Sequence, residues 1–290
     1  MKQLTDSTWV LEGPTNIGFI ENNNEVILID SGNDKESGRK INKILKEKNW
    51  NLKAVINTHS NADHIGGNRY LQINLNCEIY SPEIEEAFIR YPKLETALLW
   101  GGLEIRDLRN KFFHAKPSEP TRIIKENEEL EFGIKTFPLK GHFVNMIGIM
   151  SPDNAVFLAD SIFGQTVIGK YGIPFIYEVA EFKNSIRKIK EIKAEYYIPS
   201  HGEVEKDIIE TADKNLGLVD DIESNLIQIL QKEKSFDIIL KEICDCYNLN
   251  LNAGQYALVG STIRSFLTYL YDIDKIEYRF TGNLMQWKAL

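Results

Sequence analysis

Four side chains that could bind a metal ion lie close together within residues 58–67, and they are His59, Asn61, Asp63 and His64. Imidazole and carboxylate groups are the usual protein ligands of zinc and non-haem iron. A compact polar cluster of this kind does not fit a hydrophobic core. A polar loop with two incidental histidines is the alternative interpretation of this stretch when it is taken alone.

The flanking sequence predicts a strand before this cluster and a helix after it. Residues 52–58 form a short apolar run with β-branched side chains, which is typical of a buried strand. Gly66 and Gly67 then interrupt the chain before an apolar-periodic segment at 70–75. The cluster should therefore lie on a strand-to-helix loop at the end of a sheet, where α/β proteins place their sites.

Three more potential ligands follow predicted strands elsewhere in the chain. His142 comes after the strand pattern at 134–139, Asp160 follows the apolar run 156–159, and His201 follows residues 194–200. Each of these strand ends supplies one His or Asp, a repetition that chance does not easily explain. We expect the three side chains to meet the cluster at 58–67.

The remaining patterns predict two β-meanders, with βαβ connections after the first. The first meander has strands at 8–11, 17–20 and 26–29, and an amphipathic helix at 35–48 leads to the strand at 52. A strand at 78–80 and a helix that begins at Pro82 should follow. The second meander has strands at 130–132, 134–139, 146–150 and 155–158, and a helix at 181–193 comes after it.

An irregular, apolar insertion lies between the meanders, at residues 91–122. A flap over a pocket, a subunit contact and ordinary packing of helices all fit its composition. His114 within it has no metal-like neighbours in sequence, so we interpret it as a surface or lining residue. Several aromatic residues are candidates either for the core or for a pocket lining, and they are Trp100, Phe143, Phe163, Tyr171, Phe175 and Tyr177.

Composition limits the function classes that this chain can serve. Its 290 residues are 43% hydrophobic, which is enough for one large domain and a small one, and no apolar run approaches the ~20 residues of a membrane span. The net charge of -8 disfavours nucleic acid as a partner. We expect a cytoplasmic protein that acts on a small molecule, without a membrane partner. We also expect its three cysteines to be reduced thiols.

The last part of the chain is predicted to be helical with a final hairpin. Helices are expected at 208–232, 236–247, 253–259 and 261–271, and a hairpin turns at Gly282. From residue 205 onward there are nine Lys and Arg against fourteen Asp and Glu. This acidic balance favours packing, formation of a homodimer or a pocket wall over nucleic-acid contact.

Taken together, these motifs resemble the metallo-β-lactamase superfamily. Its pattern is HxHxDH, then Gly-His, then Asp after a strand, then Ser/Gly-His-Gly, and it corresponds here to 59–64, 141–142, 160 and 200–202. The match covers residues 5–205. The resemblance implies an α/β (α+β) fold, the αββα sandwich, with a two-metal site at one edge of the paired sheets. It also implies a catalytic domain at 1–205 and a small helical domain at 206–290, similar to the winged-helix appendage of some members.

The resemblance further implies a set of metal ligands. The first site would use His59, Asn61 and His142. The second site would use Asp63, His64 and His201, and Asp160 would bridge the two ions. Position 61 is Asn where the family has His, and an amide oxygen is a weaker zinc ligand than imidazole. Zinc is the metal expected first. Three outcomes fit the amide at position 61: a weak first site, one metal in the complete second site, or iron or manganese in place of zinc.

The activity implied by the resemblance is hydrolysis by metal-activated water, with Asp63 orienting or deprotonating that water as well as binding metal. The substrate would be a small-molecule ester, thioester, lactone or related compound, and the motif does not encode which one. Two alternatives remain on the same fold. One is an iron or diiron redox protein that reacts with O2 or NO, or acts as a dioxygenase. The other is a catalytically weak binding module.

Overall fold

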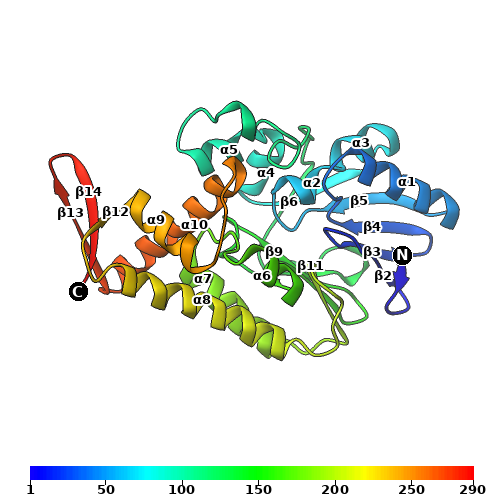
Figure 1. Cartoon of the computed structure of the whole chain (residues 1–290). Helices are drawn as coiled ribbons and strands as arrows, with labels where there is room; N and C mark the ends of the chain where they lie inside the picture. The colour runs from blue at the N-terminus through cyan, green and yellow to red at the C-terminus, as the bar shows by residue number, and fades with distance from the viewer.

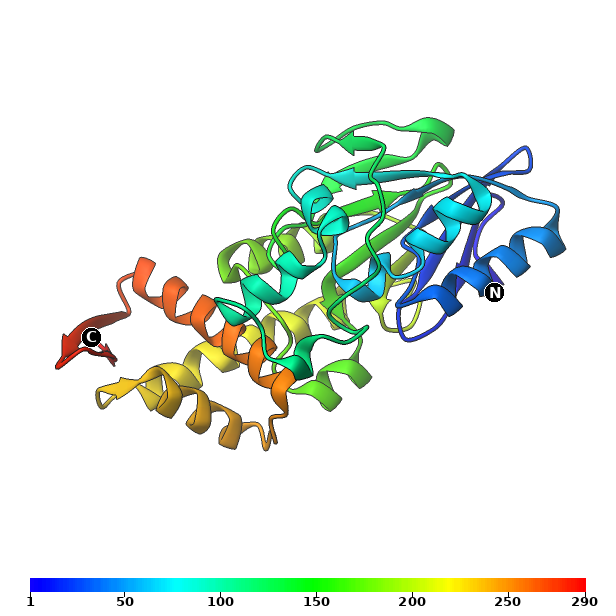
Figure 2. The same cartoon turned by 90° about the horizontal axis from the view of Figure 1, so that it is seen from above.

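The computed structural model describes the backbone of residues 1–290 and every side chain except that of Tyr171. The expected place of Tyr171 in a pocket lining therefore lies outside the described residues. Two β-sheets face each other between helical layers, as Figures 1 and 2 show. This arrangement is the αββα sandwich expected from the sequence.

The first sheet holds both the first meander and the βαβ connections. Its order is β1 (Lys2–Gln3), β2 (Thr8–Leu11), β3 (Ile17–Asn22), β4 (Glu25–Ile29), β5 (Asn51–Ile56), β6 (Glu78–Pro82) and β7 (Arg122–Ile124). Strands β1 to β4 pair in antiparallel fashion, and β4 to β7 pair in parallel. The pairing changes direction at β4, where helix α1 (Lys35–Lys48) crosses over to β5.

The second sheet has four strands, in the order β11 (Tyr196–His201), β10 (Ala155–Phe163), β9 (Ile147–Met150) and β8 (Lys135–Pro138). Only β10 and β11 pair in parallel, because α7 (Val179–Glu191) connects them. The other helices are α2 (Ala62–Ile65), α3 (Asn68–Leu75), α4 (Glu85–Arg90), α5 (Lys93–Trp100), α6 (Gln165–Tyr171), α8 (Ile209–Ile229), α9 (Phe236–Cys246) and α10 (Ala253–Asp272).

Apolar side chains fill three layers. The layer between the sheets includes Ile27, Ile56, Ile149 and Phe157. A second layer lies beneath α1 and α3, on the outer face of the first sheet. The third lies on the outer face of the second sheet and continues without a break through α7 and α8 to α9 and α10. These layers hold the two sheets firmly against each other, so the loops at their shared edge have a rigid support.

Four sequence predictions about elements are wrong, and one of them, the strand expected at 155–158, is described with the metal centre because β10 continues to Phe163. Residues 130–132 do not form a strand, because Phe132 has a φ of +62° and the chain curls into a short 3-10 turn, η2 (Glu131–Gly133). Pro82 ends β6, and the helix begins at Glu85. The helices expected at 253–259 and 261–271 are one helix, α10. Its apolar face stays buried on both sides of Gly260, and this packing outweighs the ~1 kcal/mol cost of a glycine in a helix.

The C-terminal segment, residues 206–290, extends from the sandwich as helices α8, α9 and α10 and a hairpin (Figure 1). Strands β13 (Ile276–Thr281) and β14 (Leu284–Ala289) form the predicted hairpin, and β12 (Lys234–Ser235) pairs with β14. The domain boundary at 205–206 and the winged-helix comparison stay predictions. Among the described residues, no helix combines the length and apolarity that a membrane crossing needs.

Candidate metal centre

His64 is held by a buried aspartate that the sequence prediction missed. Asp30 follows β4, and its Oδ2 lies 2.8 Å from His64 Nδ1. The same carboxylate accepts hydrogen bonds from the backbone N–H and the hydroxyl of Thr58, each at 2.8 Å. Because the Thr58 proton goes to Asp30, its hydroxyl oxygen accepts from His59 Nδ1 at 3.1 Å. Both imidazoles are therefore held through Nδ1, which leaves Nε2 as the ring nitrogen that can bind a metal.

The two other histidines are oriented by backbone carbonyl groups. His142 Nδ1 donates to the carbonyl of Phe175 at 2.9 Å, and His201 Nδ1 donates to the carbonyl of Pro14 at 2.6 Å. A carbonyl oxygen only accepts, so Nδ1 of each ring carries a proton, and in the neutral ring the lone pair is on Nε2. Such partners of the second ring nitrogen are typical of histidines that bind metal.

His142 follows a glycine that the fold requires. Gly141 has a φ of +118°, and a Cβ on it would lie 2.1 Å from the backbone nitrogen of Phe182. Only glycine fits this conformation and this approach to α7. The turn also ties down a neighbouring loop, since the Gly141 carbonyl accepts from the N–H groups of Tyr177 and Glu178 at 2.9 Å each.

Asp160 lies inside β10 and not after its end, which corrects the sequence prediction. The register of β10 against β11 shifts between Phe157 and Phe163, and Ala159 within this stretch has a φ of +50°. A non-glycine residue at positive φ marks an irregular strand, which re-aims the following side chain. The Asp160 carboxylate is thereby brought near three Nε2 atoms, those of His64 at 3.3 Å, His142 at 3.5 Å and His201 at 3.1 Å.

All seven residues predicted from the sequence meet at this edge of the sheets. Asp63, at the start of the short helix α2, has its Oδ2 3.2 Å from His201 Nε2 and 3.6 Å from His64 Nε2. The ring of His59 lies 4.0 Å from that of His64 and 5.1 Å from that of His142, centroid to centroid. Two sets of residues each have donor atoms that all lie within 4.8 Å of one another. The first set is His59, His64 and Asp160, and the second is Asp63, His64 and His201.

This donor set fits a divalent metal. Three buried atoms of the cluster lack a hydrogen-bond partner among the described residues, and they are His59 Nε2, His64 Nε2 and Asp160 Oδ1. Buried polar atoms without a partner are costly, and a cation would satisfy all three. Neutral imidazoles and carboxylates at a few ångströms are the ligands that zinc prefers.

The electrostatics of the cluster also favour a cation. Burial lowers the pKa of His59 and of His142, which keeps both rings neutral and able to act as ligands. Burial alone would also lower the pKa of His64 and His201. The carboxylates of Asp63 and Asp160 outweigh it and raise both pKa values well above the usual range. The carboxylates thus attract positive charge to this point.

Asn61 faces the cluster with its amide oxygen. Its Oδ1 lies 3.1 Å from His142 Nε2, and its Nδ2 donates to Glu95 Oε1 at 2.9 Å. Glu95 belongs to α5 in the insertion 91–122, whose apolar face packs against α10 through Leu99 and Phe113. The insertion therefore packs on the C-terminal helix, and it also delivers a carboxylate to the metal centre.

A second buried glutamate joins the two loops that carry ligands. Glu85 accepts hydrogen bonds from the N–H and hydroxyl of Ser60, and from the N–H of Asn145 at 2.7 Å. Burial raises the pKa of Glu85 to about 7. The sequence offered no signal for Glu85 or Glu95, because both lie in helices far along the chain from the residues they contact.

His114 lies outside the centre, as the sequence predicted. It is partly buried, and its Nε2 lies 2.9 Å from Thr96 Oγ1 and 3.8 Å from Glu104 Oε1. Aromatic side chains do border the centre. The Phe175 ring packs edge-on against His142 with centroids 5.3 Å apart, and Phe143 lies between His59 and Tyr177. Trp100 instead packs near Tyr256 of α10.

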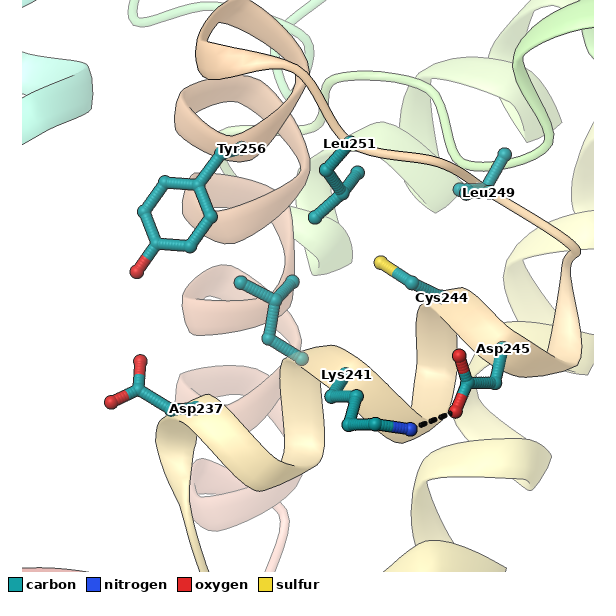
Figure 3. Close-up of a pocket in the computed structure, with 8 residues that line it drawn as sticks. Asp237, Lys241, Cys244, Asp245, Leu249, Leu251 and Tyr256 are labelled. Carbon is teal, nitrogen blue, oxygen red and sulfur yellow. Dashed lines mark hydrogen bonds and ion pairs between the residues drawn. The ribbon is translucent and has the colours of Figure 1, made fainter.

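A separate hollow of about 510 Å³ lies in the C-terminal segment (Figure 3). Its lining comes from α9, α10 and the loop between them, and includes Asp237, Cys244, Leu251 and Tyr256. Burial raises the pKa of the Cys244 thiol to about 11, so this cysteine is an unreactive thiol at neutral pH. All three cysteines are free, as predicted.

Comparison with known proteins agrees with this geometry. The sequence model of the metallo-beta-lactamase superfamily matches residues 10–201. A probable metallo-hydrolase of Methanocaldococcus jannaschii is 26% identical over 186 residues, which cover 61% of this chain and 83% of that protein. A probable metallo-hydrolase of Bacillus subtilis is 23% identical over 158 residues, covering 53% and 69% respectively.

Solved structures show the same fold over most of the chain. The crystal structure of a metallo-beta-lactamase family protein from Thermus thermophilus superposes with a TM-score of 0.79 at 15% identity, and covers 99% of this chain and 100% of that one. The DIM-1 metallo-beta-lactamase has a TM-score of 0.59 at 13% identity, and covers 76% and 96%. The superposition with the first of these proteins extends over the C-terminal segment as well.

Proposed function

Because the chain belongs to the metallo-beta-lactamase superfamily, we propose that it is a metal-dependent hydrolase of a small-molecule ester, thioester, lactone or related compound. The observation that carries this proposal is the meeting of four imidazole Nε2 atoms with the carboxylates of Asp63 and Asp160. Three buried atoms of this cluster, two of them imidazole Nε2 atoms and one a carboxylate oxygen, lack a protein partner. Zinc is the metal that this set of ligands favours.

We assign the second site to Asp63, His64 and His201, and the first site to His59, Asn61 and His142. Asp160 lies near three of the four histidines, which supports its role as the shared ligand. A bound divalent ion would acidify a water molecule to a pKa near 7 and polarise the scissile carbonyl. The protein residues supply the orientation, since every histidine is fixed through its Nδ1 atom.

Asp63 is suited to handle the proton of the attacking water. Its side chain is 31% exposed, whereas His59 and His64 are fully buried, so Asp63 faces the side from which water and substrate arrive. Thr15 Oγ1 donates to Asp63 Oδ2 at 2.9 Å and fixes the carboxylate. Burial would raise the pKa of Asp63, but His64 and His201 outweigh it and lower that pKa, so the group stays an acceptor at neutral pH.

The surroundings support a small substrate with an apolar part. Phe175 and Tyr177 lie beside His142 and Phe143, and Tyr177 is 37% exposed, so an aromatic wall borders the approach to the centre. The net charge of -8 disfavours a nucleic-acid substrate. The exact bond cleaved is set by loops that the family does not share.

A panel of chromogenic ester, thioester, lactone, β-lactam and phosphodiester substrates tests the proposal. We expect hydrolysis of at least one of the first three classes, abolished by a chelator and restored by zinc. Asp63→Ala and His201→Ala should lower kcat by about a hundredfold or more, because they remove metal ligands. His114→Ala is the matched control, and it should keep the wild-type rate. Hydrolysis that survives in Asp63→Ala would contradict the proposal.

A further inference from the structure

A buried carboxylate lies directly behind the one unusual ligand position. Glu95 in α5 is 4% exposed, and its Oε1 accepts a hydrogen bond from Asn61 Nδ2 at 2.9 Å. A carboxyl group buried in this way needs specific partners, because burial disfavours its charged form and raises the pKa of Glu95 well above its usual range. Glu95 comes from the insertion at 91–122, which lies outside the motif that carries the other ligands.

The contact with Glu95 determines which end of the Asn61 amide faces the metal centre. An amide can turn over with little change in shape, which exchanges its donor and acceptor ends. Glu95 Oε1 accepts a hydrogen bond, so it selects the orientation in which Nδ2 faces Glu95. Oδ1 then lies 3.1 Å from His142 Nε2.

The contact between Asn61 and His142 joins two acceptors. His142 donates from Nδ1 to the carbonyl of Phe175, so the Nε2 atom of the neutral ring carries a lone pair. Asn61 Oδ1 also offers lone pairs and has no proton to donate. Two acceptors held this close repel each other unless a cation lies between them. Ligands about 2.1 Å from a tetrahedral ion are about 3.4 Å apart, a spacing close to this one.

We infer that Glu95 is a positioning residue of the first metal site, which fixes the Asn61 amide so that its oxygen serves as a ligand of a divalent cation. The pair Asn61 and Glu95 thus replaces the single imidazole that the family places at this position. The inference rests on the metal binding of the proposed function, and not on hydrolysis.

Metal titration of the chelator-treated full chain tests this inference without a substrate. Cobalt(II) absorption and competition with a chromophoric chelator should resolve two binding steps, and His59→Ala identifies the step that belongs to the first site. In Glu95→Gln the new amide can donate to Asn61 and release its orientation. The affinity of that step should fall tenfold to a hundredfold, as on loss of other partners of metal ligands, and the second step should stay unchanged.

Two further variants separate positioning from a purely structural role. Glu104→Gln is the matched control, since Glu104 is 5% exposed in the same insertion but contacts Arg109 and His114. It should leave both binding steps unchanged. Asn61→Asp combined with Glu95→Gln exchanges carboxylate and amide while keeping their hydrogen bond. This double variant should restore the first step to the wild-type affinity or better.

Several results would overturn the inference. They are a single binding step in the wild-type chain, an unchanged first step in Glu95→Gln, or a double variant as weak as Glu95→Gln alone. If Glu95→Gln fails to fold, Asn61→Ala gives the same decision. It should lose affinity at the first step alone, and unchanged affinity at that step would show that the amide is no ligand. A chain that binds two ions in this way but hydrolyses nothing would leave the inference standing and refute the proposed function.

Discussion

Asp30→Asn should weaken metal binding at the second site although Asp30 itself is not a ligand. The Asp30 carboxylate accepts from His64 Nδ1 and from two groups of Thr58, each at 2.8 Å. Asparagine tolerates the φ of +61° at this position, so the backbone should be preserved. Its amide oxygen can still accept from the Thr58 N–H, but its NH2 group now faces the imidazole.

The size of the effect follows from the tautomer of His64. An NH2 group facing Nδ1 favours the ring form in which the proton is on Nε2, the atom that should bind the metal. Loss of such a partner typically costs tenfold to a hundredfold in metal affinity, or about 1.4–2.8 kcal/mol. His64 belongs to both donor sets, so the tighter binding step should show the loss.

Zinc competition with a chromophoric chelator measures this change, and Asp153→Asn is the matched control. Asp153 also accepts several hydrogen bonds, from Thr5, Ser7, Thr8 and Ser151, but it fastens the first strands to the turn at 151–154. Its replacement should lower stability and leave zinc affinity unchanged. Wild-type affinity in Asp30→Asn, or an equal loss in both variants, would refute the reasoning.

Three other predictions concern the loops around the centre. Gly141→Ala should destabilise the fold by several kcal/mol in urea unfolding, because its Cβ would lie 2.1 Å from the Phe182 nitrogen, and near wild-type stability would contradict this. For Glu85, the folded pKa of about 7 exceeds its ordinary 4.5, so its contribution to stability is present below about pH 4.5 and is lost as pH rises to 7. Urea midpoints of chelator-treated Glu85→Gln should lack this decline, and an identical slope in both proteins would count against it. Thr262→Val in α10 should cost about 1–3 kcal/mol, since it removes the acceptor of the buried Ile176 N–H next to Phe175, and an unchanged thermal midpoint would speak against that anchor.

The ligands could be predicted from the sequence because each of them follows a local signal. Short apolar runs mark the strands, and a His or Asp comes at or just beyond the run, as at His201, the last residue of β11. Asp160 shows the limit of this rule. Its strand continues to Phe163 through an irregular stretch, and nothing in the apolar pattern marks the positive φ of Ala159.

The residues that orient the ligands could not be found in the same way. Asp30 and His64 are 34 residues apart in the chain, as are Asn61 and Glu95. Their contacts depend on how β4 lies beside β5 and on how the insertion folds back, and both are decided by tertiary packing. The carbonyl groups of Phe175 and Pro14 have no sequence signal, since any residue supplies a carbonyl.

Long helices were predicted well in position and less well in extent. Helix α1 has the predicted bounds, because Asp34 caps its start and Asn49 ends it in the left-handed conformation. The sequence pattern predicts two helices in place of α10, because the local propensity of Gly260 suggests an end there. Packing against the rest of the C-terminal segment overrides that preference, as tertiary contacts often do.

Elemental analysis of the purified chain, prepared both with and without air, tests the central claim most directly. We predict zinc at about one to two equivalents per chain, a colourless protein and the same content in both preparations, because the donor set of imidazoles and carboxylates suits a metal without redox chemistry. Stoichiometric iron with an absorption spectrum that changes between the two preparations would contradict the hydrolase and favour a redox protein on the same fold.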